Sequence, residues 1–174
     1  MMIVRTIIEI PQGSQNKYEY DMATGTMRLD RVLHGAMHYP VNYGFIPKTW
    51  AEDQDPLDIL VFGSTALLPG IEVAVRVVGA LWMEDEHGID HKIVGVVDTD
   101  PRFGHVRRAE DLGPHRLHEI RHFFQEYKAL QGLLTKVGNF HDASTAENLI
   151  NECRDRFNET MRGGGNDDVP GSHS

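Results

Sequence analysis

A single cysteine, Cys153, stands among the 174 residues, so no disulfide bond can form within the chain. Such sparse cysteine is typical of a reducing compartment, and we expect a cytoplasmic protein. No apolar run approaches the length of a membrane-spanning helix, and the first residues lack the sustained apolar stretch of a signal peptide. The sequence therefore predicts a globular protein without a membrane partner.

Basic residues are also few, because 17 Lys and Arg stand against 26 Asp and Glu, which gives a net charge of −9 with neutral histidines. This charge opposes general binding to nucleic acids or to anionic membranes. It is compatible with a site that gathers divalent cations. The chain also lacks a G-x-x-x-x-G-K-[ST] loop, which excludes that mode of phosphate binding.

Internal repeats are absent, and a length of 174 residues fits one domain with a sizeable core. We expect residues 1–162 to form that single domain. Three glycines from Gly163 onward open a polar segment that ends at Ser174. This composition predicts a flexible, glycine-rich tail over residues 163–174.

Carboxylates are concentrated in one short stretch, where Asp53, Asp55 and Asp58 fall within six residues. Side chains of a strand alternate between its faces, so Asp58 points away from the side of Leu57 and Ile59. Three carboxylates this close repel one another unless a proton or a cation intervenes, and Mg²⁺ prefers such oxygen ligands. The alternative is a solvated turn whose aspartates bond to their own backbone. An EF-hand is excluded, because Asp58 stands at the sixth position, which requires glycine.

Hydrophobic periodicity predicts strands first and helices last. Alternating, β-branched segments predict strands over residues 3–10, 17–21, 26–33, 57–62, 71–83 and 90–97, of which the second and third form a hairpin. Helical spacing predicts one helix over residues 117–130 and another that starts at the capping box Ser144-x-x-Glu147, with Cys153 in its apolar face. This order predicts a mainly β, α+β fold, namely a five-stranded OB-type barrel with two flanking C-terminal helices.

Other polar groups give no site by themselves. His87 and His91 lack a third histidine or a cysteine at zinc-ligand spacing, so we predict no zinc site. No role follows from the sequence for His34, His38 or His87. The segment 98–112 is predicted to be a loop, and its basic group is interpreted as a solvated patch formed by Arg102, His105, Arg107 and Arg108.

Several short polar blocks occur in a fixed order along the chain. They are Glu9-Ile10-Pro11, Lys17-Tyr18-Glu19, Asp30-Arg31, Tyr39-Pro40 with Asn42-Tyr43-Gly44, Asp53-x-Asp-Pro-x-Asp58, Asp85 with Asp90-x-Lys92, and Tyr127-Lys128. In this order and at these separations they resemble the soluble inorganic pyrophosphatases of bacterial type, from about Ile3 to the last helix. One departure is Gln54, where the family usually has a small or short polar residue. We expect it to alter the turn and to leave the ligands intact.

The resemblance implies Mg²⁺-dependent hydrolysis of inorganic pyrophosphate to two orthophosphates by a metal-activated water, with Mn²⁺ able to replace Mg²⁺. It implies several metal ions in each subunit, held by Asp53, Asp58, Asp85, Asp90 and Glu19. It gives catalytic roles to Asp55, which orients and deprotonates the water, and to Arg31 and Tyr43. The implied substrate-binding residues are Lys17, Arg31, Tyr43, Lys92, Tyr127 and Lys128, and Glu9 and Tyr39 have supporting positions. Bacterial members of this subunit length are typically homohexamers, so the resemblance also implies a homohexamer.

Other functions stay open on the residues alone. A non-enzymatic OB module for single-stranded nucleic acid needs a basic groove with stacking aromatics, which the net charge of −9 opposes. A phosphatase for organic esters would share the metal ions and would need a pocket for the organic group. A metal-buffering protein would bind the same cations without turnover.

Overall fold

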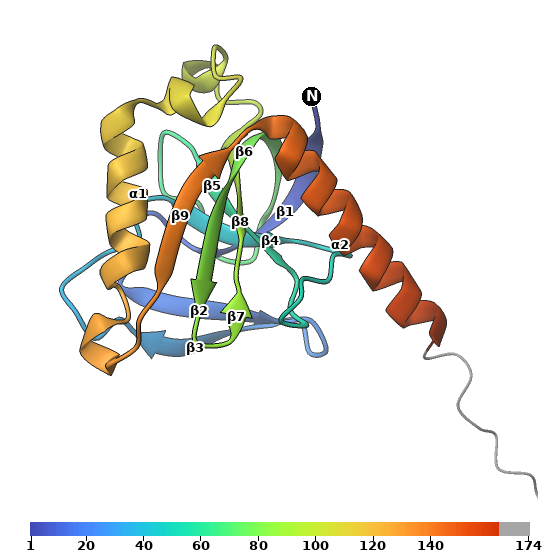
Figure 1. The fold of residues 1–174 in the computed structure, drawn as a ribbon, viewed down its shortest axis with the longest axis horizontal. Coiled ribbons are helices and arrows are strands. Elements are labelled where there is room, and N and C mark those ends of the chain that lie inside the picture. The colour runs from blue at the N-terminus through green and yellow to red at the C-terminus, as the bar shows by residue number, and fades with distance from the viewer. Residues whose placement is uncertain (164–174) are drawn as a thin grey trace, which may run out of the picture.

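The computed structural model describes residues 1–163. Figure 1 shows a β-barrel between two helices, α1 (Pro114–Glu126) and α2 (Ala143–Gly163). The tail predicted over residues 163–174 lies outside the described residues, apart from Gly163, which is the last residue of α2. The region for which we expect a single domain, residues 1–162, is described in full.

Five strands close into a ring. Their order is β1 (Ile3–Ile10), β4 (Asn42–Ile46), β5 (Leu57–Phe62), β8 (Lys92–Val97) and β6 (Glu72–Asp85), and β6 pairs back onto β1. The pairing of β5 with β8 is parallel, and the other pairings of the ring are antiparallel. The predictions of a mainly β fold, a five-stranded barrel and two C-terminal helices are confirmed.

Further strands lie outside this ring. The predicted hairpin is present as β2 (Asn16–Asp21) and β3 (Thr26–Val32), which form a separate two-stranded sheet. The long strand β6 also pairs with β7 (Gly88–Ile89) and with β9 (Lys136–His141). The strand predicted over residues 90–97 is present as β8, which begins at Lys92. The sequence pattern does not predict β9, because its residues are partly or fully exposed and show no apolar alternation.

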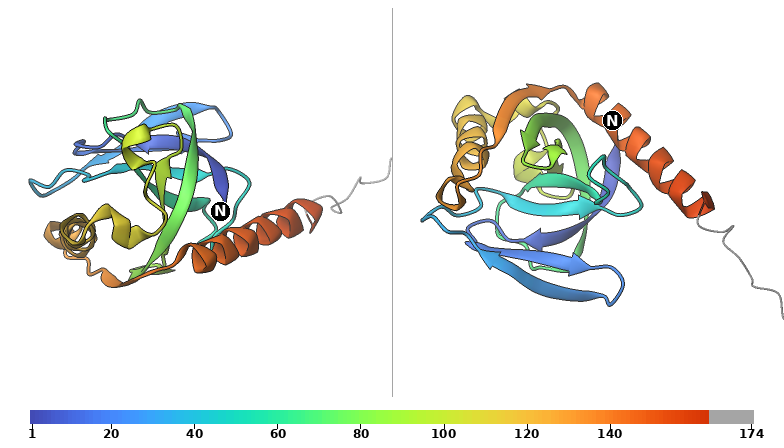
Figure 2. Two further views of the ribbon diagram at one scale, coloured as in Figure 1. Left: turned by 90° about the horizontal axis from the view of Figure 1, so that it is seen from above. Right: turned by 60° about the horizontal axis from the view of Figure 1, so that its bottom comes forward.

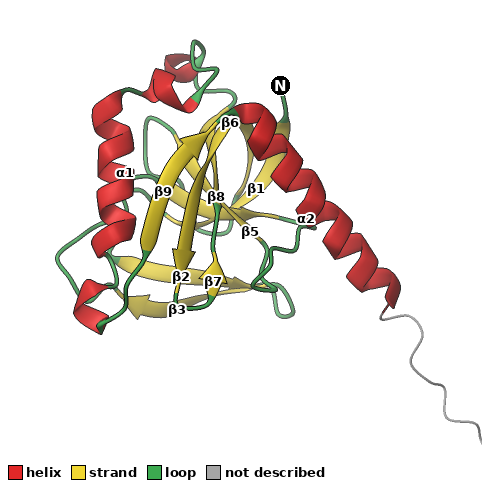
Figure 3. Ribbon diagram, in the orientation of Figure 1, coloured by secondary structure: helices red, strands yellow, loops and turns green. Residues whose placement is uncertain are grey.

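The first helix begins at Pro114, a residue that suits the first helical turn. It ends at Glu126 rather than at residue 130, because the chain then tightens into the short 3-10 helix η3 (Ala129–Gln131). The segment 98–112, predicted to be a loop, contains two more 3-10 helices, η1 (Pro101–Phe103) and η2 (Ala109–Leu112). Figure 3 shows these helical segments outside the strands.

The second helix begins at Ala143 rather than at the predicted capping box from Ser144. The carboxylate of Asp142 accepts the backbone N–H of Thr145 at 2.8 Å, so Asp142 provides the cap instead. Figure 2 shows that α2 runs along the barrel and then extends past it. Among residues 1–163, the structure contains no helix that is long and apolar enough to cross a membrane.

Two apolar clusters fix the helices to the barrel. One includes Phe123 and Phe124 of α1, and the other includes Ile150 and Cys153 of α2. Cys153 is fully buried, as predicted, and burial raises the pKa of its thiol to about 11. An ionised thiolate is therefore disfavoured, which agrees with a packing role for this residue.

Strands of a small barrel cross closely, and one crossing requires glycine. A Cβ atom on Gly44 of β4 would lie 2.0 Å from the carbonyl oxygen of Ile7 in β1. No side chain fits at that distance, so glycine allows the two backbones to approach. Tyr43, the neighbour of Gly44, is thereby held at a fixed place in the barrel wall.

Candidate active site

Side chains from many separate segments line one cleft of about 480 Å³. They come from β1, the β2–β3 hairpin, β4, the acidic loop and the start of β5, the connection from β6 to β8 with the first residue of β8, and the residues that follow α1. The cleft contains every predicted site residue except Tyr39, namely Glu9, Lys17, Glu19, Arg31, Tyr43, Asp53, Asp55, Asp58, Asp85, Asp90, Lys92, Tyr127 and Lys128. The fold thus brings together groups that the sequence spreads over most of the chain.

Asp58 lies at the centre of the polar contacts in this cleft. Its strand, β5, buries Leu57 and Ile59 in the core and leaves Asp58 partly accessible, as the alternation predicts. The Oδ2 atom of Asp58 accepts a hydrogen bond from the Tyr43 hydroxyl at 2.6 Å and another from Lys92 Nζ at 2.6 Å. One carboxylate oxygen therefore joins a phenol from β4 to an ammonium from β8.

Lys92 is a cation held inside the protein by two acids. It is 2% exposed, and its Nζ also donates to Asp90 Oδ1 at 2.5 Å, so Asp90 and Lys92 share a face as predicted. Burial lowers the pKa of Lys92, but the attraction of Asp58 and Asp90 is larger and raises it well above its usual range. Burial, with the nearby charge of Asp58, raises the pKa of Asp90 to about 6 despite the ammonium. A single Lys92 cannot neutralise both carboxylates.

The acidic loop places two more carboxylates at the cleft. Asp53 Oδ1 accepts the backbone N–H of Asp55 at 3.1 Å, so one of these aspartates does bond to its own turn. Burial raises the pKa values of both Asp53 and Asp55, and repulsion from neighbouring carboxylates adds to this effect. Gln54 between them has a φ of 65°, in the left-handed region. Gln54, which differs from the small or short polar residue usual at this position in the family, is therefore the residue that turns the loop.

Lys128 is held between the acids of the β6–β7 turn. Its Nζ donates to Asp85 Oδ2 at 3.1 Å and to both carboxylate oxygens of Glu86 at 3.0 and 3.1 Å. Burial alone would raise the pKa of Asp85, but hydrogen bonds from the His87 N–H and from Lys128 lower it. Asp85 therefore stays ionised and available as an oxygen ligand.

A second group of charges lies on the β2–β3 hairpin. Lys17 Nζ donates to Glu19 Oε1 and to Asp30 Oδ2, both at 3.1 Å, and Arg31 Nη1 donates to the same Asp30 oxygen at 3.1 Å. The Nε atom of Arg31 is buried and has no hydrogen-bond partner within residues 1–163. A buried donor without a partner is costly, and an anionic ligand in the cleft would satisfy it.

The two supporting residues have different surroundings. Glu9 accepts the backbone N–H of Tyr20 at 2.9 Å, and burial raises its pKa to about 7. Tyr39 is 2% exposed and does not line the cleft, because its ring packs behind Tyr43 with the centroids 5.5 Å apart. Burial and the Asp58 charge raise the pKa of Tyr43 well above 10, so its phenol remains a hydrogen-bond donor.

The donor set fits hard divalent cations. Nine carboxylates and four Lys or Arg side chains line the cleft, so negative charge is in excess. Within residues 1–163, however, no three carboxylate, imidazole or thiol groups are arranged as a ready-made metal cluster. Mg²⁺ retains several waters and uses only one or two carboxylates together with phosphate oxygens, so it does not require such a cluster. The residues therefore fit magnesium ions that bind together with a phosphate compound.

Two residues with direct contacts to the cationic groups receive no role from the sequence analysis. Asp30 bonds to Lys17 and Arg31, and Glu86 bonds to Lys128. Asp30 stands in one of the blocks that carry the family resemblance, but it receives no role there, and the only signal for Glu86 is its adjacency to Asp85. Charged residues in turns and exposed strands are commonly solvated. The structure shows that both carboxylates hold the cationic side chains that border the cleft.

Comparison with known proteins decides the family. The sequence model of the family described as inorganic pyrophosphatase matches residues 6–158. The chain belongs to the inorganic pyrophosphatase family. This family member is 50% identical over 157 residues to an inorganic pyrophosphatase of Geobacillus stearothermophilus, an alignment that covers 90% of this chain and 95% of that protein.

Solved structures agree with this assignment. The crystal structure of inorganic pyrophosphatase from Thermus thermophilus is similar with a TM-score of 0.87 and 49% identity, over 90% of this chain and 91% of that one. The enzyme of Helicobacter pylori gives a TM-score of 0.88 at 38% identity, over 90% and 94% of the two chains. A truncated vacuolar soluble pyrophosphatase of Trypanosoma cruzi, solved in complex with PPi, gives 0.85 at 26% identity, over 93% of this chain and 71% of that one.

Proposed function

We propose that this family member is a hydrolase that cleaves inorganic pyrophosphate into two orthophosphates, with Mg²⁺ as its cofactor. The observation that carries the proposal is the composition of the cleft, where nine carboxylates stand beside four Lys or Arg side chains. Cations held by the acids and the basic side chains together match a small, highly charged diphosphate. The relatives named inorganic pyrophosphatase support the same reaction.

The carboxylates provide the ligands for the cofactor. Those that would hold Mg²⁺ are Asp53, Asp58, Asp85, Asp90 and Glu19, and Mn²⁺ would bind to the same oxygens. Bound ions neutralise charge on the phosphates and lower the pKa of a coordinated water. Lys92 shares its ammonium between Asp58 and Asp90, so these two acids keep an excess of negative charge for a cation.

The basic and phenolic groups provide the contacts for the substrate. Arg31 presents a buried Nε without a partner in residues 1–163, and a guanidinium binds phosphate oxygens through two parallel donors. Tyr43 is a protonated donor in the cleft, and Tyr127, whose pKa burial raises, is another. The ammonium groups of Lys17, Lys92 and Lys128 complete the set of cations that would contact phosphate.

Asp55 is the residue that would orient the attacking water and accept its proton. It is solvent-exposed at the cleft, so water reaches it, whereas its neighbours Asp53 and Asp58 accept hydrogen bonds from protein groups. Partial desolvation at the cleft, together with the charges of Asp53 and Asp58, raises the pKa of Asp55, which makes it a stronger base. Its side chain therefore suits proton transfer better than its neighbours do.

The test is phosphate release from pyrophosphate by the purified full chain, with Mg²⁺, with Mn²⁺ and with an excess of chelator. We expect rapid release with Mg²⁺, weaker release with Mn²⁺ and none with chelator. ATP and a simple phosphate monoester serve as alternative substrates. Faster release from either of them would show an organic phosphatase, and metal binding without any release would show a metal-buffering protein.

Assembly and location belong to the same proposal. We infer a cytoplasmic homohexamer, because the chain has the subunit length of bacterial members and only one cysteine, which is buried. Light scattering coupled to size-exclusion chromatography measures the mass directly. A mass of one subunit of 19.7 kDa would contradict the hexamer and leave the proposed reaction unaffected.

A further inference from the structure

The acidic loop has to be held in place from outside the barrel. Asp53 and Asp55 lie between β4 and β5, in a segment without strand pairing. Its internal bonds are few: Ala51 N–H donates to Asp55 O at 2.8 Å, Gln54 N–H donates to Ala51 O at 3.1 Å, and Asp55 N–H donates to Asp53 Oδ1 at 3.1 Å. These bonds shape the turn, but they do not fix it to the rest of the protein.

One anchor joins the base of this loop to the barrel. The hydroxyl of Thr49 donates to the carbonyl of Ile46 in β4 at 2.5 Å and accepts the N–H of Leu57 in β5 at 2.9 Å. Thr49 is 1% exposed, so this bridge is protected from water. It holds the two ends of the loop together, whereas the middle extends beyond it.

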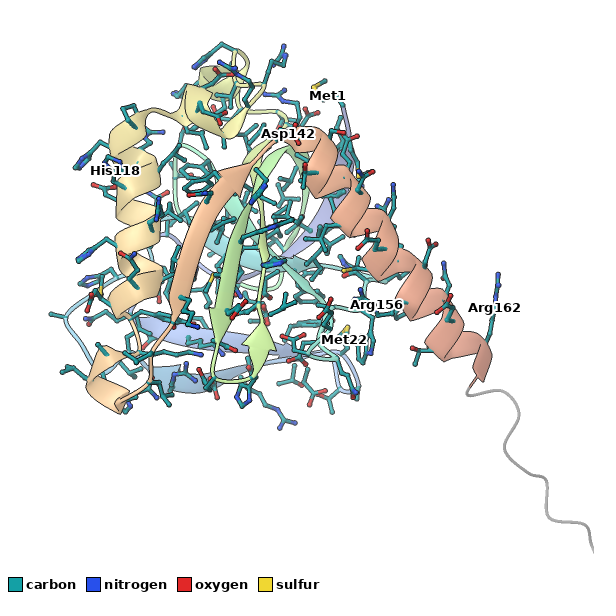
Figure 4. The ribbon with its side chains drawn as sticks, viewed as in Figure 1. Met1, Met22, His118, Asp142, Arg156 and Arg162 are labelled. Atoms are coloured by element: carbon teal, nitrogen blue, oxygen red, sulfur yellow. The ribbon has the colours of Figure 1, made fainter. Side chains whose placement is uncertain are left out.

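The other anchor comes from α2. The backbone N–H of Trp50 donates to the carbonyl of Cys153 at 2.9 Å, and the carbonyl of Trp50 accepts Nη1 of Arg156 at 2.8 Å. Both backbone groups of Trp50 are thus bound to one helix, three residues before Asp53. Figure 4 labels Arg156 on the side of α2 toward the barrel and Arg162 at the far end of the helix.

A small crevice lies between the loop and the helix. It measures about 30 Å³, and its lining includes Asp53 and Asp58 from the site and Leu149, Cys153 and Arg156 from α2. Ala51, Leu149 and Cys153 belong to one apolar cluster at this junction. The guanidinium of Arg156 makes the only side-chain hydrogen bond between α2 and this loop among residues 1–163. Movement of α2 at this point would therefore displace the carboxylates.

We propose that Arg156 is a positioning residue, which sets the place of Asp53 and Asp55 through its bond to Trp50 and thereby sets the affinity of the site for divalent cations. This inference rests on the proposed function, because it takes those aspartates to be cation ligands and water-binding groups. Arg156 itself does not line the cleft. Its cationic donor also bonds more strongly to a carbonyl than a neutral group would.

The experiment measures Mn²⁺ binding to the full chain by electron paramagnetic resonance, without substrate, and pyrophosphate turnover as a function of Mg²⁺. The variants are Arg156→Met, which keeps most of the side-chain length, and Arg156→Lys, which keeps a charged donor. The control is Arg154→Met, because Arg154 lies on the same helix and its side chain makes no hydrogen bond or ion pair within residues 1–163.

We expect Arg156→Met to weaken Mn²⁺ binding and to raise the Mg²⁺ concentration for half-maximal activity by roughly fivefold to tenfold, since a bond from a charged donor is lost. At saturating Mg²⁺, kcat should fall by less than about threefold, because the bound metal holds the loop. Arg156→Lys should recover most of the affinity, and Arg154→Met should match the wild type.

Unchanged Mn²⁺ affinity in Arg156→Met, in a wild type that binds Mn²⁺ and hydrolyses pyrophosphate, would overturn the inference alone. A lower melting temperature with unchanged affinity would do the same, because it would show a purely structural role. No Mn²⁺ binding by the wild type would overturn both the inference and the proposed function. Mn²⁺ binding that depends on Arg156 without pyrophosphate turnover would support the inference and remove the proposed reaction.

Discussion

The acidic cleft and a second cavity, which is lined in part by residues of η1, η2 and α1, share no lining residue. The second cavity is the larger, about 660 Å³ against about 480 Å³, and it too is lined by charged residues. Its acids are few, however, and Asp111 accepts the backbone N–H groups of Arg107 and Arg108, which lowers its pKa.

Several acids of the cleft behave in the opposite way, whereas Asp85 and Glu86, which bind Lys128, have lowered pKa values like Asp111. The pKa values of Asp53 and Asp55 are raised, and that of Asp90 reaches about 6. In the second cavity Asp111 is stabilised in its charged form, whereas the cleft keeps carboxylates close together at a cost in free energy. The excess of closely spaced carboxylates, rather than the volume, therefore distinguishes the acidic cleft from the second cavity as a candidate site. We therefore use a substitution in the second cavity as the control for each substitution in the cleft.

Loss of the proposed base should have the largest effect. We expect Asp55→Asn to lower kcat by about 10²- to 10⁴-fold, because general base catalysis is lost while the shape of the side chain is kept. Folding and Mn²⁺ binding should persist, since the Asp55 backbone, not its carboxylate, bonds to Asp53. Glu119→Gln in the second cavity should leave kcat unchanged. Wild-type turnover in Asp55→Asn would remove Asp55 from this role.

The buried cation should matter next, and mainly for stability. Lys92→Met leaves Asp58 and Asp90 without their shared partner, so the free energy of unfolding, measured with chelator, should fall by about 3 kcal/mol. Mg²⁺ should restore part of this loss, since a cation can replace the ammonium. Arg116→Met, from the second cavity, should change stability by less than about 0.5 kcal/mol. Equal effects of the two substitutions would abolish the distinction between the cavities.

Glu9 should make stability depend on pH. Its pKa rises from 4.5 to about 7 in the fold, so the folded state binds more protons than the unfolded state in that window. Stability in chelator should therefore fall as pH rises through this window. Glu9→Gln should flatten that fall and stabilise the protein at pH 8 by no more than about 3 kcal/mol. Chemical denaturation at several pH values measures this, and a profile parallel to those of the wild type and of Glu119→Gln would contradict the burial argument.

The smallest effect should come from a change that keeps the charge. Arg31→Lys removes the forked donor group but not the cation, so kcat/KM for pyrophosphate should fall by about tenfold. Arg102→Lys in the second cavity should have no effect on kcat/KM. An unchanged kcat/KM in Arg31→Lys would show that the guanidinium does not contact the substrate.

Much of the fold follows from local patterns. The alternation in residues 3–10 predicts β1 with its observed bounds, and the stripe with Phe123 and Phe124 predicts the buried face of α1. The strand β9 has no such pattern, because its stability comes from pairing with β6. The predicted cap of α2, Ser144, lies two residues after the observed cap, Asp142. Both are suitable capping residues, and only the tertiary fold selects one of them.

The sequence by itself determined the chemistry available to this protein: its carboxylate oxygens, its basic side chains, and the alternation that turns Asp58 away from the core. Short-range periodicity encodes such features, because neighbouring residues share one backbone conformation. Only the tertiary structure decided that Asp30 and Glu86 hold the cationic side chains, that Tyr39 packs behind Tyr43, and that Arg156 binds the acidic loop. These contacts join residues through closure of the barrel and docking of the helices, which no local pattern specifies.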